Sequence, residues 1–448
     1  MEKNSRIIKT LLIVLAALII IGLIVAAAIV SLGKPDGEDG GKNENTEGDQ
    51  SGENIPEVKT VSYYFAEKGF EVFLPSYVDI IEDTFRRKYY KPDELPSSEE
   101  LAEGAASLYD EYCRGKVDET DHFEVTYALI DCMIETIGDK YAFYRTKEET
   151  EDYVTNMSGS FAGIGVDVLR NSLENTILIE AVHIGAPAES AGILPGDYII
   201  GVDGLSINDI GAESVINKVR GEVGTTVSVT VKRGESSLTF EMVRAPLTET
   251  TVSTSYLEGG SVALIRITGF KDNTSEQFAE AVNEVESSGA KSVIFDLRGN
   301  GGGYLTAVSE MLSYLVPDGT PIASFTNGKG ALFAYSGTDI EPTDHVLTLP
   351  SAVVVNENSA SASELFTAAM RDYNDMELLE STVVGTVTFK KGVMQSTYDY
   401  SDGSSLTLTI SLYNPPSGIN FDGVGVSPDI TVNEGEDFIE KALSALKE

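Results

Sequence analysis

The sequence is poor in basic residues and in cysteine, and each shortage excludes a class of function. Its 448 residues include 32 Lys and Arg against 71 Asp and Glu, giving a formal net charge of −39. This charge opposes binding to nucleic acid and direct attraction to anionic lipid. The two cysteines, Cys113 and Cys132, lack metal-ligand spacing, so we expect no metal and no cofactor. Whether they pair as a disulfide stays open.

Histidine is also scarce, which bears on the choice of a catalytic base. His122, His183 and His345 are the three histidines, and all lie outside recognisable catalytic contexts. A serine nucleophile would therefore need a different base. Lysine can serve if burial lowers its pKa from about 10.4, because only the neutral amine accepts a proton.

A serine in a suitable place occurs within residues 351–395. Ala352–Val355 is a short apolar β-branched run, and apolar residues recur at helical spacing from Leu365 to Tyr373. Ser361 is therefore predicted at a strand-to-helix turn. The unpaired amides of a helix start lie there, where an oxyanion would form.

A lysine follows this serine in the sequence. Alternation along residues 387–393 predicts a strand that places Lys391, and not Lys390, on the buried face. The alternative is a Ser- and Ala-rich loop followed by a solvated edge with two lysines.

A glycine-rich segment provides a second candidate part of the site. Lys291–Arg298 is typical of a buried parallel strand, Gly299–Gly303 of a tight loop, and residues 304–316 of a helix. Glycines allow the backbone to approach a substrate carbonyl and present amide donors. A Rossmann-type loop is a weaker alternative, because GNGGG is not G-x-G-x-x-G. A helix entry without a ligand also stays open.

Together these segments resemble the C-terminal processing peptidases, the tail-specific serine proteases with a Ser–Lys dyad. The matching residues are Ser361–Glu364 for S-A-S-E, Phe389, Lys391, Gly392 and Gln395 for F/Y-G-K-G-x-x-Q, and Asp296–Gly303 for D-L-R-x-N-x-G-G. The resemblance extends with gaps from Val72 to the C-terminus. Two departures are Lys390, where the family has glycine, and an Asp372–Lys391 segment longer by about five residues, which a loop can absorb.

The resemblance assigns roles residue by residue. It implies Ser361 as nucleophile, Lys391 as general base, Gln395 as the group that orients the lysine, Ala362 and Gly302 as oxyanion-hole amides, and Asp372 as structural support. Whether Gly302 or Gly303 supplies the second amide stays open.

Residues 161–246 resemble a PDZ domain of the bacterial protease type. Ala186–Ala188, Gly196–Asp197 and Gly201–Gly204 carry this resemblance. It implies that Gly163, Ile164 and Gly165 bind a peptide's terminal carboxylate while the peptide adds as a strand. Protein or peptide substrates with free apolar C-termini are therefore the expected partners. A β-rich structural insert is the alternative.

The N-terminal segment predicts a membrane anchor. Three basic residues precede Leu11–Leu32, a charge-free run long enough for the roughly 20 residues of a spanning helix and too long for a cleaved signal core. The basic residues place 1–10 in the cytoplasm and the remainder outside, on a single-pass protein of a bacterial cell membrane. Residues 33–60 are expected to form an acidic, disordered linker.

These features predict a multi-domain α/β protein. After the transmembrane helix come a helical scaffold (70–157), the PDZ-like domain (161–246) and a crotonase/ClpP-like α/β catalytic core (247–448), to which part of 70–157 would contribute. The expected function is that of a membrane-anchored extracytoplasmic serine endopeptidase that recognises protein C-termini. The alternative is a catalytically inactive PDZ scaffold or adaptor at the cell envelope. A homo-oligomer stays open.

Overall fold

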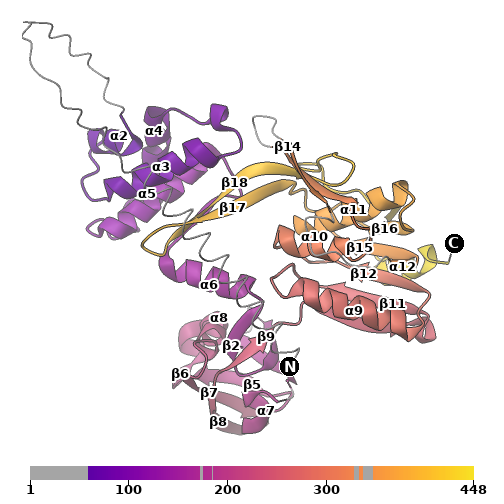
Figure 1. The fold of residues 1–448 in the computed structure, drawn as a ribbon. Coiled ribbons are helices and arrows are strands. Elements are labelled where there is room, and N and C mark those ends of the chain that lie inside the picture. Colours follow the sequence, from indigo (N-terminus) through magenta and orange to yellow (C-terminus); the bar gives the residue numbers. More distant parts are fainter. Residues whose placement is uncertain (1–58, 172–174, 184, 327–331, 337–346, 448) are drawn as a thin grey trace, which may run out of the picture. The chain divides into compact units, whose positions relative to one another are not determined.

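The computed structural model describes residues 59–171, 175–183, 185–326, 332–336 and 347–447 (Figure 1). The predicted cytoplasmic end and membrane anchor and nearly all of the acidic linker lie outside these residues, as does His345. Within the described ranges, no helix combines the length and the apolarity that crossing a membrane requires. The anchor predicted at Leu11–Leu32 therefore stays a prediction.

Four α-helices form the first part of the described chain. They are α2 (Val61–Glu67), α3 (Pro75–Lys88), α4 (Ser98–Leu108) and α5 (His122–Ile137), with a π-helix, η2 (Tyr109–Cys113), after α4. Side chains cap the N-termini of two of these helices. Ser97 accepts a hydrogen bond from a backbone N–H at the start of α4, and Asp121 does so at the start of α5. The helices share a core with Leu406 and Leu408, so this region is joined to the C-terminal part of the chain.

A six-stranded sheet forms the centre of the C-terminal part. Its order is β10 (Val252–Leu257), β11 (Val262–Ile267), β12 (Ser292–Asp296), β15 (Ser351–Val355), β16 (Ser381–Gly385) and β19 (Ile430–Thr431). β10 and β11 are antiparallel, whereas the other neighbours are parallel.

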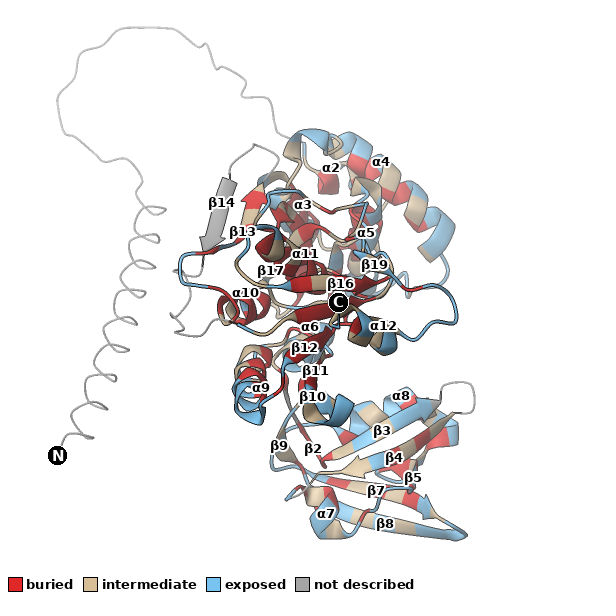
Figure 2. Cartoon of the chain, turned by 90° about the vertical axis from the view of Figure 1, so that its right-hand side faces the viewer, coloured by how far each residue is buried: buried red, intermediate tan, exposed pale blue. Residues whose placement is uncertain are grey.

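Helices cover both faces of this sheet, which explains why β12 and β15 are buried along their whole length (Figure 2). Phe295 of β12 packs with the core that contains α9 (Thr274–Ser288), α10 (Leu305–Ser313) and α11 (Ala362–Asp375). Its neighbour Ile294 points to the other face and packs with the core that includes α12 (Phe438–Ala445).

A second sheet is built on a long hairpin of β17 (Val393–Asp399) and β18 (Ser405–Asn414) (Figure 1). β18 also pairs with β1 (Phe143–Arg145) and β13 (Pro321–Thr326), and β13 pairs with β14 (Leu332–Ser336). The pairing of β1 with β18 brings the segment after α5 beside the hairpin.

The region between α6 (Lys147–Met157) and β10 forms a β-rich module. The paired strands β2 (Ser160–Gly163) and β9 (Ala245–Thr248) lead into and out of it. Its sheet has the order β3 (Val166–Asn171), β4 (Thr176–Val182), β5 (Tyr198–Val202), β7 (Thr226–Arg233) and β8 (Ser236–Val243), with β6 (Leu205–Ser206) on β5. Helices α7 (Pro187–Ala191) and α8 (Ile207–Val219) accompany the sheet, and the module has a hydrophobic core of its own.

Candidate active site

Ser361 lies at the strand-to-helix turn that the sequence predicts. The loop after β15 ends at Ser361, and α11 begins at the next residue. The backbone of Ser361 has φ 57° and ψ −115°, in a region that side-chain-bearing residues rarely occupy. Strained backbone of this kind is concentrated at functional sites, where the surrounding structure must hold it in place.

The carboxylate of Glu364 holds this turn and the lysine segment together. It is fully buried and accepts hydrogen bonds from the backbone N–H groups of Ser361 (2.9 Å), Lys390 (2.7 Å) and Lys391 (2.8 Å). The hydroxyl of Thr388 is a fourth donor, at 2.5 Å. One side chain thus fixes the backbone on both sides of the candidate dyad.

The prediction of a strand along residues 387–393 is wrong. β17 begins only at Val393, and the preceding residues are irregular because the N–H groups of Lys390 and Lys391 bond to Glu364 and not to a neighbouring strand. Lys390 has a φ of 82°, which lies in the region of positive φ that favours glycine, and its side chain is exposed. Of these two lysines, Lys391 is the half-buried one, as predicted. Its burial does not, however, result from alternation along a strand.

The side chain of Lys391 is oriented by polar and aromatic groups. Its Nζ donates to Gln395 Oε1 at 2.6 Å and lies 4.8 Å from the centre of the Tyr141 ring. Burial lowers the pKa of Lys391 below its ordinary value, although the negative charges of Asp139 and Glu364 oppose this effect. A lysine with a lowered pKa is neutral, and able to accept a proton, at a lower pH than an exposed lysine.

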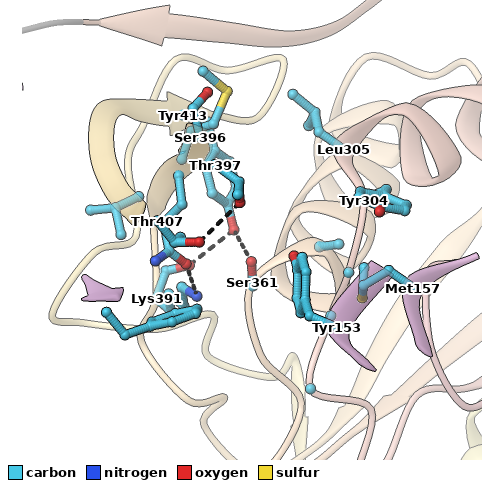
Figure 3. A pocket seen from close by; sticks show the side chains of 18 of the residues that line it. Tyr153, Met157, Tyr304, Leu305, Ser361, Lys391, Ser396, Thr397, Thr407 and Tyr413 are labelled. Carbon is cyan, nitrogen blue, oxygen red and sulfur yellow. Dashed lines mark hydrogen bonds between the residues drawn. The ribbon is translucent and has the colours of Figure 1, made fainter. Parts of the chain in front are cut away.

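Ser361 and Lys391 line one cavity of about 670 Å³ (Figure 3). Tyr413 links them, because its Oη lies 3.4 Å from Ser361 Oγ and donates to the backbone oxygen of Lys391 at 2.9 Å. Among the hydrogen bonds of the described residues, none joins Ser361 Oγ directly to Lys391 Nζ. Catalytic hydrogen bonds are often long or absent without substrate, so this geometry is compatible with proton transfer.

The glycine-rich loop packs directly against the serine turn. A Cβ on Gly302 would lie 2.8 Å from the Cβ of Ser361 and 3.0 Å from the backbone N of Ala362, so only glycine fits there. The N–H of Gly302 donates to the side chain of Asn300 at 2.9 Å. Asn300 is fully buried and donates to Ile267 O, which fixes the loop.

Two buried aspartates outside the cavity fix nearby segments of the chain. Asp372 accepts a hydrogen bond from the N–H of Ser417 at 2.9 Å and so holds the segment after β18. Asp296 pairs with Arg298 (2.8 Å) and Arg266 (2.7 Å) at the start of the glycine-rich loop. Burial raises the pKa of Asp296, but hydrogen bonds from the two arginines prevail and lower it.

The sequence analysis missed three residues of the site. It gave no role to Glu364 and did not single out Tyr413. It also placed Tyr141 in a scaffold, whereas the structure puts the Tyr141 ring beside Lys391 and its backbone oxygen on Gln395 Nε2. The signal that could have drawn attention to Tyr141 is the segment Gly138–Tyr141 that directly follows α5.

In the β-rich module, the predicted carboxylate-binding loop precedes an open sheet edge. Ile164 and Gly165 connect β2 to β3, and β3 pairs with β4 alone within the module's sheet. The backbone oxygens of Ile164 and Gly165 accept hydrogen bonds from Ala188 (2.8 Å) and His183 (3.0 Å). The carbonyls are thus bound within the module beside an edge to which a peptide strand could add.

Neither described histidine lies in the cavity. His122 contacts the backbone oxygen of Phe73 at 3.3 Å, and His183 contacts Asp167 at 2.9 Å. In the part of the chain that the structure describes, no three His, Cys, Asp or Glu residues are grouped as metal ligands would be.

A serine at a helix start, a half-buried lysine and a glycine-rich loop around one cavity define a serine-hydrolase type of site on an α/β core. Comparison with known proteins agrees with this class: residues 261–432 match the model of Peptidase family S41, and residues 178–233 match that of the PDZ domain. The chain therefore carries a family S41 peptidase domain and a PDZ domain.

Curated relatives are similar to the chain over part of their length. A probable CtpA-like serine protease of Staphylococcus aureus (strain COL) is 34% identical over 313 residues, which cover 70% of this chain and 61% of that protein. One of Staphylococcus haemolyticus (strain JCSC1435) is 32% identical over 309 residues, covering 69% and 60%. The chain thus spans about three-fifths of the length of these relatives.

Solved structures with lower identity also resemble the chain. The photosystem II D1 C-terminal processing protease is 23% identical, with a TM-score of 0.49, covering 87% of this chain and 98% of that one. Mature CPAF is 14% identical, with a TM-score of 0.41, covering 86% and 96%. Because both TM-scores are below 0.5, the family assignment rests on the sequence matches.

Proposed function

We propose that the chain is a serine endopeptidase that hydrolyses peptide bonds with a dyad of Ser361 and Lys391. The observation that carries this proposal is a strained serine and a lysine of lowered pKa in one cavity, with their backbones bound to the same buried carboxylate. Burial supplies the neutral amine that a lysine base requires.

In the first half of the reaction, Ser361 Oγ attacks the substrate carbonyl while Lys391 Nζ accepts its proton. The C–N bond then breaks, Lys391 returns the proton to the leaving amine, and an acyl-serine ester remains. In the second half, water attacks the ester with Lys391 again as base, which releases the carboxylate and restores the serine. Gln395 orients the lysine through the 2.6 Å hydrogen bond.

The oxyanion of each tetrahedral intermediate would be bound by the N–H of Ala362 at the start of α11. The glycine-rich loop would supply a second donor. Since the N–H of Gly302 is already bound to Asn300, we assign this role to Gly303 rather than to Gly302.

The two walls of the cavity indicate how a substrate would lie. Figure 3 shows Ser361 between a wall with Lys391, Thr397 and Thr407 and a wall with Met157, Tyr304 and Leu305. Lys391 must reach the leaving amine, so the leaving segment would lie along the polar wall. The residue that carries the attacked carbonyl would then place its side chain on the apolar wall.

The conformation of Lys390 argues against an inactive scaffold. The feature that most favours that alternative is Lys390 in place of the family glycine. Lys390 nevertheless adopts a glycine-like φ of 82°, so Lys391 keeps its place in the cavity.

The pH dependence of cleavage tests the proposal. Because the active form of Lys391 is neutral and its pKa is lowered by burial, the rate should rise with pH and reach its plateau below the ordinary lysine pKa. The measurement is kcat/KM for an unfolded protein with an apolar C-terminus, across a range of pH at which the enzyme stays folded. Cleavage at no pH, together with tight binding of the same protein, would favour the scaffold.

The PDZ domain should recognise a free C-terminal carboxylate. We expect a peptide with an apolar C-terminal residue to bind at Gly163, Ile164 and Gly165, where β2 ends and the loop to β3 follows, and along β3. Amidation of the same peptide should weaken binding about tenfold or more, because a neutral amide loses charge-assisted hydrogen bonds. Equal dissociation constants for the acid and the amide, measured by calorimetry, would refute this mode.

The proposed location is outside the cytoplasm, on an anchor formed by Leu11–Leu32. The motivating observation is the charge-free run preceded by basic residues. External protease added to intact cells should cut residues 33–60 and release the catalytic part. A mature protein that starts after residue 32 and is found free in the medium would instead show a cleaved signal.

A further inference from the structure

Tyr141 lies in a loop that is fixed against the hairpin carrying Gln395. The loop joins α5 to β1, and the N–H of Tyr141 donates to Asp139 Oδ1 at 3.1 Å. Asp139 is buried and also accepts from the backbone N–H and the hydroxyl of Thr409, each at 3.0 Å. Thr409 is the cross-strand partner of Gln395 in the β17–β18 pair. Asp139 therefore holds Tyr141 at the position along the hairpin where Gln395 lies.

The backbone oxygen of Tyr141 determines which way the Gln395 amide points. Gln395 Nε2 donates to Tyr141 O, and a carbonyl oxygen can only accept. The other end of the amide, Oε1, must then face Lys391 Nζ, whose ammonium or amine hydrogens it accepts. With the amide reversed, its oxygen would face the carbonyl of Tyr141 and that hydrogen bond would be lost. Its NH₂ group would face the lysine and could bond only to the lone pair with which the neutral amine accepts a proton.

The ring of Tyr141 acts on the lysine itself. Its centre lies 4.8 Å from Lys391 Nζ, so the ring covers one side of the amine and limits both water and rotamer freedom there. Lys140 Nζ lies at the same distance from the ring, but Lys140 is exposed and is outside the cavity lining. Lys140 therefore offers a matched control.

We propose that Tyr141 is a positioning residue for the base, with its ring limiting the movement of Lys391 and its carbonyl setting the Gln395 amide. The helical region thereby completes the active site and does not serve as a scaffold alone. This inference rests on the Ser361–Lys391 mechanism and adds to it.

The test compares Tyr141→Leu, Tyr141→Phe and Lys140→Ala in the full chain. Tyr141→Leu should lower kcat about tenfold or more with little change in KM, because a slightly misplaced base slows proton transfer without changing substrate contacts. Tyr141→Phe retains the ring that Tyr141→Leu removes, and both retain the backbone carbonyl, so kcat of the Phe variant should stay near that of the wild type. Lys140→Ala should also stay near it. Wild-type kcat in Tyr141→Leu, or an equal loss in the Phe and Leu variants, would overturn the proposal.

A double variant distinguishes loss of positioning from misfolding of Tyr141→Leu. In a Gln395→Ala background the base has already lost its oriented partner, so Tyr141→Leu should cost less there than in the wild type. Multiplicative losses would overturn the inference. An unchanged urea denaturation midpoint for Tyr141→Leu checks that the chain is folded. An inactive wild type would refute the proposed function itself, whereas an active wild type with unaffected Tyr141 variants would refute this inference alone.

A separate observation concerns the two cysteines. Cys113 is the last residue of η2 and is half-buried, whereas Cys132 lies in α5 and is buried. Their sulfur atoms are 4.0 Å apart, although the two residues are 19 positions apart in the chain. Neither lines the catalytic cavity.

We infer that Cys113 and Cys132 are placed to form a disulfide bond, which would form in an oxidising compartment. A small disulfide such as oxidised glutathione is the oxidant. The Cys113 sulfur attacks it and releases one thiol, and the Cys132 sulfur then attacks Cys113 Sγ and releases the second thiol. The two cysteine protons pass to the released thiols, so the cysteines are oxidised and the small disulfide is reduced.

Oxidation of the folded full chain by glutathione disulfide tests this site. We expect loss of both free thiols, a mass lower by two hydrogen atoms, and a cross-linked peptide that contains Cys113 and Cys132. The denaturation midpoint should rise, because the bond closes a loop in the unfolded chain. Stable glutathione adducts on either cysteine, or two thiols that remain free, would overturn the inference.

Discussion

Replacement of Ser361 or Lys391 by alanine should lower turnover by roughly 10⁴-fold or more, because a nucleophile and its base act as one unit. The double variant should be no slower than either single variant, since removal of one partner already abolishes the step in which both act. The measurement is kcat for cleavage of an unfolded protein with an apolar C-terminus, with circular dichroism to check folding. Multiplicative losses would contradict a single dyad.

Lys390→Gly is the matched control for this experiment. Glycine adopts the φ of 82° without strain and removes the neighbouring charge, so activity should be retained. If Lys390→Gly were inactive and Lys391→Ala active, the base would be Lys390 and the loop around Glu364 would have a different arrangement from that in the structure.

Replacement of Glu364 by alanine should have the second-largest effect. Four donors converge on this buried carboxylate, and removal of the acceptor leaves them without a partner in the interior. The expected cost is about 3–5 kcal/mol of stability, with a large loss of activity because both the serine turn and the lysine loop are released. Urea unfolding, monitored together with kcat, measures both quantities.

Glu364→Gln and Glu357→Gln refine this test. Glutamine fills the same space but has one acceptor oxygen, so Glu364→Gln should fold and lose activity by about 10²-fold through misplacement of the dyad. Glu357 is exposed and bonds only to the Thr386 hydroxyl at 3.2 Å, among its side-chain hydrogen bonds in the described structure. Glu357→Gln should therefore be neutral. A Glu364→Gln enzyme with wild-type kcat would show that the carboxylate does not position the dyad.

Features that depend on neighbouring residues could be predicted from the sequence. The turn at Ser361 could be predicted from a short apolar run and from apolar residues at helical spacing, which lie within about 25 residues of each other. Over such a range, hydrophobic periodicity is informative about secondary structure. The strands and glycines of the PDZ domain are local in the same sense. The matches to the S41 and PDZ models confirm the family prediction, which rested on such segments.

Features that depend on distant residues could not be predicted. Gln395 and Tyr141 are 254 residues apart, and Tyr413 and Ser361 are 52 apart, so no periodicity connects them. The strand through Lys391 was predicted wrongly because alternation is a local signal, and the buried Glu364 side chain replaced the strand partner that alternation assumes. Which lysine enters the cavity was thus decided by one carboxylate 27 residues away.

Labelling by a fluorophosphonate tests the central claim most directly, because it reports an activated serine without requiring a known substrate. The wild type should be labelled on Ser361, as identified by peptide mapping, at a rate that rises with pH as Lys391 loses its proton. Lys391→Ala should be labelled far more slowly, and Lys390→Gly at a rate near that of the wild type. A wild type that is not labelled at any pH, or a Lys391→Ala variant labelled as fast as the wild type, would contradict the Ser361–Lys391 dyad.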